Sequence, residues 1–199
     1  MPMSRARRGR PGHAQEDVIE AAVELFNRHG YDATSMGMLA ERLGISKSAI
    51  YHHVPGKEQL LGIALDRALH ELESILDRPE ILARPEDERV ELALRAMVGV
   101  LVDDLPHVTL LLRLRGNTPM ERRALERRRA FDRRIAELIK AAAAEGRLRD
   151  DLDPGAVTRL LFGMVNSITE WYRPHGTMDK RQLADTVIAI ALQGLRPRA

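Results

Sequence analysis

The sequence predicts an all-α protein, and its composition and hydrophobic spacing support that prediction. Ala, Leu, Arg and Glu dominate the 199 residues, whereas runs of β-branched residues are scarce and aromatic residues make up only 4%. Apolar residues recur at helical spacing along most of the chain. We therefore expect about nine helices, arranged as a small three-helix unit at the front and a larger helical body behind it.

The front of the chain begins with a basic segment. Residues 1–13 are expected to form a flexible arm, with Arg5, Arg7, Arg8 and Arg10 and no acidic residue. A first helix is expected over residues 14–29, with acids in its first turn and Arg28 and His29 in its last. Gly30 then suits the position just after the helix.

The next two expected helices are separated by a sharp stop. The second begins after a Thr34 or Ser35 cap and ends at Gly44, and Ile45 supplies the apolar contact of a Schellman-type ending. The third is short, residues 47–53, because Ser46 caps its start and Val54-Pro55 ends it. A helix that short is not stable alone, so neighbouring helices must hold it.

The rear of the chain continues the helical pattern. A proline-bearing connector is expected at residues 77–88, and Asp153 followed by Pro154 marks a helix start. The remaining expected helices span residues 57–77, 90–101, 107–115, 119–145, 154–172 and 179–195.

Two helices joined by a glycine-containing turn, the second one short, describe a helix-turn-helix. The residues expected to face inward are Ala40, Leu43, Ile45 and Ile50. The residues left facing outward are Ser46, Lys47, Ser48, Tyr51 and His52. Lysine and hydroxyl side chains contact phosphates, and Ser, His and Lys reach base edges in the major groove. The simpler interpretation is a helical corner with a solvated polar face.

The stretch "LFNRHGYDATSMGMLAERLGISKSAIYHHVPGKEQLL", residues 25–61, resembles the DNA-binding domain of the tetracycline-repressor (TetR) family. The matching residues are Phe26, Gly30, Tyr31, Thr34, Leu39, Ala40, Leu43, Gly44, Ile45, Ser46, Tyr51, His53, Lys57, Glu58, Leu60 and Leu61. The detailed match covers about residues 12–72, and the length and helical pattern of the rest also suit the family. The resemblance implies a homodimeric, ligand-responsive transcriptional repressor that binds a palindromic operator in double-stranded DNA.

The resemblance also assigns roles to individual residues. Thr34 or Ser35, Tyr51 and Lys57 are expected to contact phosphates, with Lys57 as a phosphate clamp. Ser46, Lys47, Ser48 and His52 are expected to contact bases or phosphates, while Arg8 and Arg10 reach the adjacent minor groove.

Two residues in this region are unusual. Val54 stands where many family members have Phe, and it is expected to pack beneath the turn. Gly37 lies inside an expected helix, which indicates a close approach of another group to the backbone, with DNA as one candidate.

The implied domains are the arm at 1–13, a DNA-binding domain at 14–58 with its motif at about 35–54, and an effector-binding and dimerisation domain at 59–199. In the family, the last two long helices build the dimer. Both carry wide apolar stripes here, although the sequence does not separate interface from core.

Residues 113–134 carry nine arginines and three acids, a net charge of +6. Most of these arginines fall off the apolar face of the expected helix, but Arg128 lies on it. An arginine on an apolar stripe needs an anionic partner. That partner is either an acid on a neighbouring helix or an anionic ligand.

The pattern "NSITEWYRPHG", which begins at Asn166, resembles family members that regulate fatty-acid, phenylacetate and sterol-ring catabolism and respond to acyl-coenzyme A thioesters. Such a ligand needs a basic rim and an apolar pocket. The candidate ligand-binding residues are Met97, Arg113, Arg128, Asn166 and Trp171. Met164 and Met178 are further candidates, although methionines are more simply core residues.

Other functions remain as alternatives. A regulator of an efflux gene would respond to an apolar or cationic drug, and an architectural DNA-binding protein would need no effector cavity. No catalytic motif and no metal-ligand spacing stands out among the residues, so we expect no enzyme, no metal and no cofactor. The chain has no Cys, no apolar run near the roughly 20 residues of a membrane span, and no apolar segment after its basic start. We therefore expect no membrane partner, no secretory signal and a cytoplasmic location.

Overall fold

The computed structural model describes residues 11–174 and 176–195, and within them it contains helices and no strand. The all-α prediction is confirmed. The nine expected helices correspond to α1 (Pro11–His29), α2 (Met36–Leu43), α3 (Lys47–Tyr51), α4 (Lys57–Ser74), α6 (Glu86–Asp103), α7 (Leu105–Leu112), α8 (Pro119–Ala144), α9 (Pro154–Trp171) and α10 (Lys180–Leu195). Between α4 and α6, the chain also forms the 3-10 turn η1 (Ile75–Asp77) and the short helix α5 (Pro79–Leu82).

The contacts divide the chain into two compact units, one that ends at Leu65 and one that starts at Asp66. Helix α4 contributes residues to both units. The division into a DNA-binding domain up to residue 58 and an effector domain after it is functional, and it stays a prediction.

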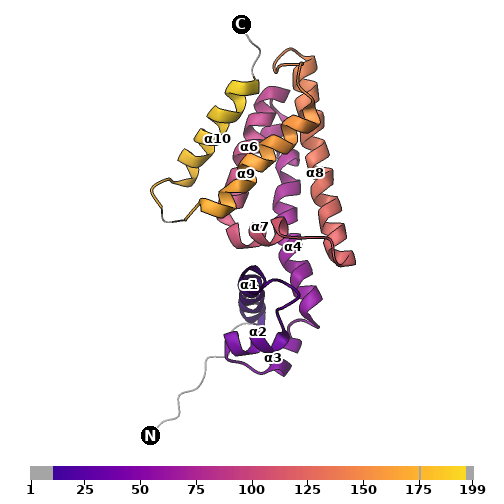
Figure 1. Ribbon diagram of the computed structural model, residues 1–199, viewed down its shortest axis with the longest axis vertical. Helices are drawn as coiled ribbons and strands as arrows, with labels where there is room; N and C mark the ends of the chain where they lie inside the picture. Colours follow the sequence, from indigo (N-terminus) through magenta and orange to yellow (C-terminus); the bar gives the residue numbers. More distant parts are fainter. Residues whose placement is uncertain (1–10, 175, 196–199) are drawn as a thin grey trace. The chain divides into compact units, whose positions relative to one another are not determined.

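The first unit contains α1, α2, α3 and the start of α4 (Figure 1). Its most deeply buried side chains come from all four helices, since Val23, Ile50 and Leu61 are fully buried and Leu39 is nearly so. The short helix α3 is thus held through Ile50 on its inner side, as its length required.

The turn between α2 and α3 has the hydrogen bonds of a Schellman ending. Gly44 adopts the left-handed conformation with a φ of 65°, its N–H donates to the Glu41 carbonyl, and the Ile45 N–H donates to the Ala40 carbonyl. The expectation that Ile45 faces inward is wrong, because its side chain is 40% exposed. Leu43 is only half-buried, so the inward residues of this turn are Ala40 and Ile50.

Helix α3 is two residues shorter than expected. Ser46 caps its start by accepting a hydrogen bond from the Ala49 N–H at 3.2 Å. At the end of the helix, the Ile50 carbonyl accepts hydrogen bonds from the N–H groups of both His53 and Val54. Val54 is buried, as expected for a residue that packs beneath the turn.

The second unit is a helical bundle around α6. Helix α6 contacts α8, α9 and α10, and α8 also packs along α9 (Figure 1). Two of its long helices begin at strong caps. Thr118 accepts from the Glu121 N–H at the start of α8, and Asp153 accepts from the Ala156 N–H at the start of α9, where Pro154 holds the first position.

Gly44 gives a direct test of this fold. We expect Gly44→Ala to lower the free energy of unfolding by about 1–2 kcal/mol, because a side chain is disfavoured in the left-handed conformation. Gly99 in α6 is the matched control, since a Cβ there meets nothing within 4 Å and its φ is helical. Gly99→Ala should leave the stability unchanged or raise it. Thermal denaturation measures both, and equal effects would contradict the assigned turn.

Candidate functional site

The outer face of α3 presents the polar residues that the sequence placed there. Lys47, Ser48, Tyr51 and His52 are exposed, and so is the cap residue Ser46. The Tyr51 ring is 51% exposed, whereas Ile50 beside it has no exposed surface. The helix therefore separates one buried residue from a continuous polar surface that is free to meet another molecule.

The two serines at the helix starts also serve as caps. Ser35 accepts a hydrogen bond from the Met38 N–H, and Ser46 accepts one from the Ala49 N–H, each at 3.2 Å. Each hydroxyl keeps its own proton to donate. Both side chains are exposed, so contact with a phosphate remains open to them.

Thr34, which with Ser35 was a candidate for a phosphate contact, is bonded within its own loop in this structure. Its side chain is buried, and its hydroxyl lies 2.8 Å from the Gly30 carbonyl and 3.3 Å from the Leu25 carbonyl. The Thr34 N–H donates to Tyr31. The structure thus uses Thr34 to close the loop after α1, and Ser35 is the one that caps α2.

Lys57, the expected phosphate clamp, binds backbone carbonyls of its own chain in this structure. Its ammonium group donates to the carbonyls of Tyr31, Asp32 and Thr34 at 2.8, 3.3 and 2.9 Å, and it lies 4.3 Å from the centre of the Tyr31 ring. An ammonium group has three hydrogens, so these bonds use all of its donors. Lys57 therefore ties the start of α4 to the loop before α2.

The close approach expected at Gly37 is made by Lys47. A Cβ added at Gly37 would lie 3.1 Å from Cε and 3.3 Å from Nζ of Lys47. The missing side chain lets Lys47 lie across the start of α2. Arg8 and Arg10 lie outside the described residues.

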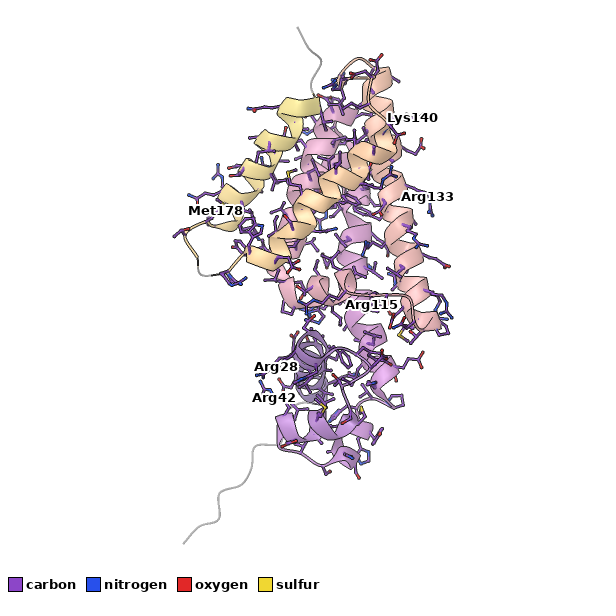
Figure 2. The ribbon with its side chains drawn as sticks, viewed as in Figure 1. Arg28, Arg42, Arg115, Arg133, Lys140 and Met178 are labelled. Carbon is purple, nitrogen blue, oxygen red and sulfur yellow. The ribbon has the colours of Figure 1, made fainter. Side chains whose placement is uncertain are left out.

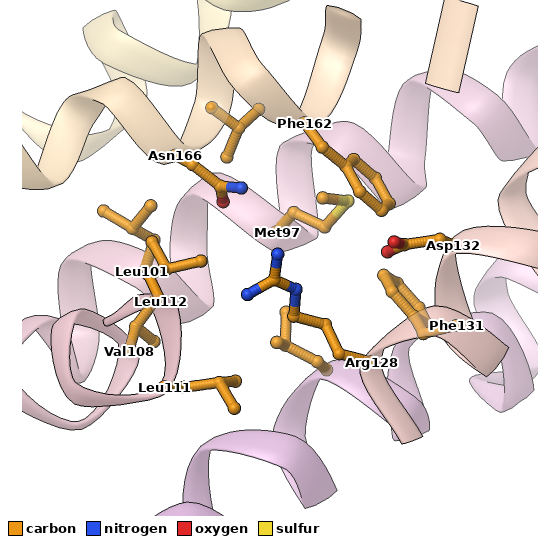
Figure 3. A pocket seen from close by; sticks show the side chains of 12 residues that line it. Met97, Leu101, Val108, Leu111, Leu112, Arg128, Phe131, Asp132, Phe162 and Asn166 are labelled. Atoms are coloured by element: carbon orange, nitrogen blue, oxygen red, sulfur yellow. The ribbon is translucent and has the colours of Figure 1, made fainter. Parts of the chain in front are cut away.

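The second unit contains a mainly apolar cavity between α4, α6, α7, α8 and α9 (Figure 3). Its lining residues are Leu72, Met97, Leu101, Val108, Leu111, Leu112, Arg128, Phe131, Asp132, Phe162, Val165 and Asn166. The space measures about 430 Å³ with its opening to solvent, but only about 30 Å³ admits the centre of a water molecule. The lining side chains therefore leave little free space in the cavity.

Arg128 enters this cavity without a partner. Figure 3 shows its guanidinium pointing toward Met97 and Asn166, and it forms no hydrogen bond or ion pair with any other residue that the structure describes. Carboxylates on α4 and η1 are nearby but bind other arginines. Glu73 and Asp66 bind Arg127, with Glu73 at 2.8 Å, and Asp77 binds Arg134 at 2.5 Å.

The pKa values of the nearby acids show which of them are paired with an arginine. The Arg127 guanidinium lowers the pKa of the Glu73 carboxyl, and the Arg134 guanidinium lowers that of Asp77. Burial instead raises the pKa of Asp132, and the positive charge of Arg128 opposes that rise only in part. The expected acidic partner from a neighbouring helix is therefore not found for Arg128 within the described chain.

Three of the five candidate ligand residues meet at this cavity, namely Met97, Arg128 and Asn166. Arg113 and Trp171 do not line it. Arg113 is exposed at the end of α7, and the Trp171 ring is 52% exposed and packs edge-on against Tyr172. Met164 and Met178 are also absent from the lining, and Met178 lies on the loop before α10 (Figure 2).

Sequence reasoning missed Asp132 and Phe162 as cavity residues. Asp132 lies four residues after Arg128 and so on the same helical face, a signal that was present in the spacing. Phe162 stacks on Phe131 with ring centres 5.9 Å apart. Only the packing of α8 on α9 brings the two rings together.

Basic side chains cover the outside of α8. Arg133 and Lys140 project away from the bundle in Figure 2. Arg115, Arg123, Arg129 and Arg133 are exposed and form no ion pair within the described part of the chain. Part of the +6 charge is thus neutralised by α4 and η1, and the remainder is available to an anion outside the cavity.

Within the described ranges, no helix is long and apolar enough to cross a membrane. The same residues include no group of three His, Cys, Asp or Glu side chains placed to hold a metal ion.

Family models match both parts of the chain. The model for bacterial regulatory proteins of the tetR family matches residues 18–62, and the model for the tetracyclin repressor-like C-terminal domain matches residues 83–195. The HTH-type transcriptional repressor KstR2 of Mycolicibacterium smegmatis is 24% identical over 196 residues, which cover 93% of this chain and 92% of that protein.

Solved structures share the fold over nearly the whole chain. A member of the TetR transcriptional regulator family from Streptomyces coelicolor A3 is 48% identical, with a TM-score of 0.85 over 99% of this chain and 96% of that one. AibR, solved in complex with isovaleryl coenzyme A and operator DNA, is 23% identical, with a TM-score of 0.75 over 88% of this chain and 96% of that one. At that identity, the similarity to AibR concerns the fold.

Proposed function

The chain belongs to the TetR family of bacterial regulatory proteins, and we propose that an acyl-coenzyme A thioester controls its binding to a palindromic operator. It is a DNA-binding transcriptional regulator that responds to a small molecule, as its repressor relatives indicate. The single observation that carries the proposed effector is Arg128, which enters an apolar cavity and forms no hydrogen bond or ion pair with the described residues.

The exposed polar face of α3 supports the proposed contact with DNA. Lys47, Ser48, Tyr51 and His52 reach the major groove from this face, and Ser35 and Ser46 donate their hydroxyl protons to phosphates. Thr34 and Lys57 act indirectly, because they fix the loop from which α2 starts. In a dimer, the two α3 helices read half-sites about 34–36 Å apart.

TetR regulators bind operators as dimers, and we propose that α9 and α10 form this interface. Both helices leave large apolar side chains uncovered, since Leu160 is 75% and Ile190 63% exposed. Burial of such side chains against a second copy favours association.

The acyl-coenzyme A proposal explains two separate features of the second unit. The apolar cavity suits an acyl chain, and the exposed arginines of α8 suit the phosphates. Arg128 pairs with an anionic group of the ligand at the cavity. The structure of AibR with isovaleryl coenzyme A shows that this fold accepts such a ligand.

The cavity must open to admit an acyl chain. Its free space for water is about 30 Å³, well below the roughly 300 Å³ typical of ligand pockets. Ligand binding therefore favours a more open arrangement of its walls, and α4 belongs both to these walls, through Leu72, and to the DNA-binding unit. A ligand that binds the open state more tightly shifts the protein away from the operator.

The alternatives fit the cavity less well. A cationic drug would meet the positive charge of Arg128, and a protein without an effector would have no use for a half-buried arginine that forms no ion pair in its cavity. We further propose that the protein has no catalytic activity of its own and acts in the cytoplasm, where bacterial operators are found.

The salt dependence of operator binding tests the DNA-reading face. Lys47→Ala should lower affinity and reduce the slope of log K against log salt by about 0.9, because one phosphate contact is lost. Lys57→Ala should leave that slope unchanged but lower the free energy of unfolding by about 1 kcal/mol or more. Fluorescence anisotropy at several salt concentrations and thermal denaturation separate the two roles. A flatter slope for Lys57→Ala alone would reverse the assignment.

A second test concerns the effector. Thermal shift and calorimetry should show binding of an acyl-coenzyme A, weaker binding of free coenzyme A and of the free acid, and none of a lipophilic cation. Arg128→Leu should raise the acyl-coenzyme A Kd by roughly ten-fold or more, since a charged hydrogen bond is lost.

Arg84→Leu is the matched control, because it removes the same charge from an exposed position between α5 and α6, away from α8 and the cavity lining. It should change the Kd by less than about three-fold. The effector assignment fails if no acyl-coenzyme A binds, and the role of Arg128 fails if the two variants lose affinity equally.

A further inference from the structure

Asp132 brings a second unsatisfied group to the cavity. Its Oδ1 atom is buried and accepts no hydrogen bond from the described residues. Its carboxyl lines the cavity, and Figure 3 shows it beside Phe131 and Phe162. A buried acceptor without a donor destabilises a protein by about 1–3 kcal/mol, so its presence in a ligand cavity needs an explanation.

Arg128 does not supply the missing donor. The two residues lie one helical turn apart on α8, about 6 Å along its axis, yet they form no ion pair within 4 Å. The guanidinium points toward Met97 and Asn166, whereas the carboxyl lies on the side of the stacked Phe131 and Phe162 rings. A ligand that fills the cavity therefore meets the two groups separately.

The chemistry of the surroundings selects the kind of group that Asp132 can bind. A cation would be repelled by Arg128, and one carboxylate among apolar side chains is too few ligands for a metal ion. An anion or a bare hydrocarbon would leave the carboxyl unsatisfied. A neutral hydrogen-bond donor satisfies Oδ1 without adding charge.

We propose that Asp132 accepts a hydrogen bond from a hydroxyl or amide N–H of the effector, one helical turn along α8 from the anionic group held at Arg128. This inference rests on the proposed effector-binding function and narrows the ligand to one with both groups. In an acyl-coenzyme A thioester, the donor comes either from the pantetheine arm or from a hydroxyl on the acyl chain. Burial raises the pKa of the Asp132 carboxyl, which agrees with a group that gains from a bound donor.

The test uses the full-length protein and three variants, namely Asp132→Leu, Asp132→Asn and the control Glu126→Gln. Glu126 lies on the same helix but is exposed. Calorimetry measures the Kd of a saturated acyl-coenzyme A, of hydroxyacyl- and oxoacyl-coenzyme A of the same chain length, and of the free hydroxylated and unsubstituted acids.

Asp132→Leu should weaken binding by roughly ten-fold or more, and Glu126→Gln should not. If the acyl hydroxyl is the donor, the wild type prefers the hydroxyacyl compound and Asp132→Leu loses that preference. If the pantetheine arm is the donor, all coenzyme A thioesters weaken equally.

The unliganded protein provides a readout independent of binding. Because the folded-state pKa of Asp132 is raised, its ionisation opposes folding as the pH rises through that pKa. Asp132→Asn should therefore raise the melting temperature more at pH 7 than at pH 4, which also shows that the variant folds.

Two results would overturn the inference. One is an Asp132→Leu protein that binds every ligand as tightly as the wild type. The other is a wild-type preference for the oxoacyl compound, because Asp132 would then donate rather than accept. If the wild type binds no coenzyme A compound, the proposed effector is wrong. The role of Asp132 is then decided by the Kd values of the two free acids, and it fails if the wild type does not bind the hydroxylated acid more tightly than the unsubstituted one.

Discussion

The second unit depends on how its arginines are neutralised. Arg127 and Arg134 lie seven residues apart on α8 and therefore on one face, where Glu73 and Asp77 meet them. Arg128 lies about 100° further around the helix, out of reach of those acids and toward the cavity. The same ion pairs that fix α8 against α4 and η1 thus leave one positive charge pointing inward.

The first unit depends on a different constraint, the five-residue length of α3. A helix of that length does not hold its own shape, so its outer face is positioned by its surroundings. Ile50 anchors it, Ser46 caps it, and the Schellman ending at Gly44 sets its direction. Lys57 and Thr34 hold the loop before α2, and we propose that they support the DNA-reading face from there.

The sequence predicted nine helices of the described chain because their caps and apolar spacing are local signals, but it missed the four-residue helix α5, which lies in the expected connector. Asp153-Pro154 and Gly44 marked their helix ends correctly for that reason. The sequence did not show that Ile45 faces solvent, because its direction depends on the left-handed turn before it.

The sites were predicted less completely than the fold. Spacing identified Arg128 as an arginine on an apolar face, and the structure places it at the cavity with Met97 and Asn166. Trp171 and Arg113 do not line this cavity, and the sequence did not show this because spacing along one helix does not encode proximity across helices. The sequence also did not predict the hydrogen bonds that the Lys57 ammonium group donates, because the carbonyls that accept them lie 23 to 26 residues away along the chain.

We propose that an acyl-coenzyme A and the operator oppose each other's binding to this protein. Such coupling is reciprocal, so each ligand must weaken the binding of the other by the same factor. The direct measurement is the operator Kd with and without saturating acyl-coenzyme A, together with the acyl-coenzyme A Kd with and without saturating operator. We expect equal losses of affinity, roughly five-fold or more, in both directions. An operator Kd that does not change when acyl-coenzyme A is bound would contradict it.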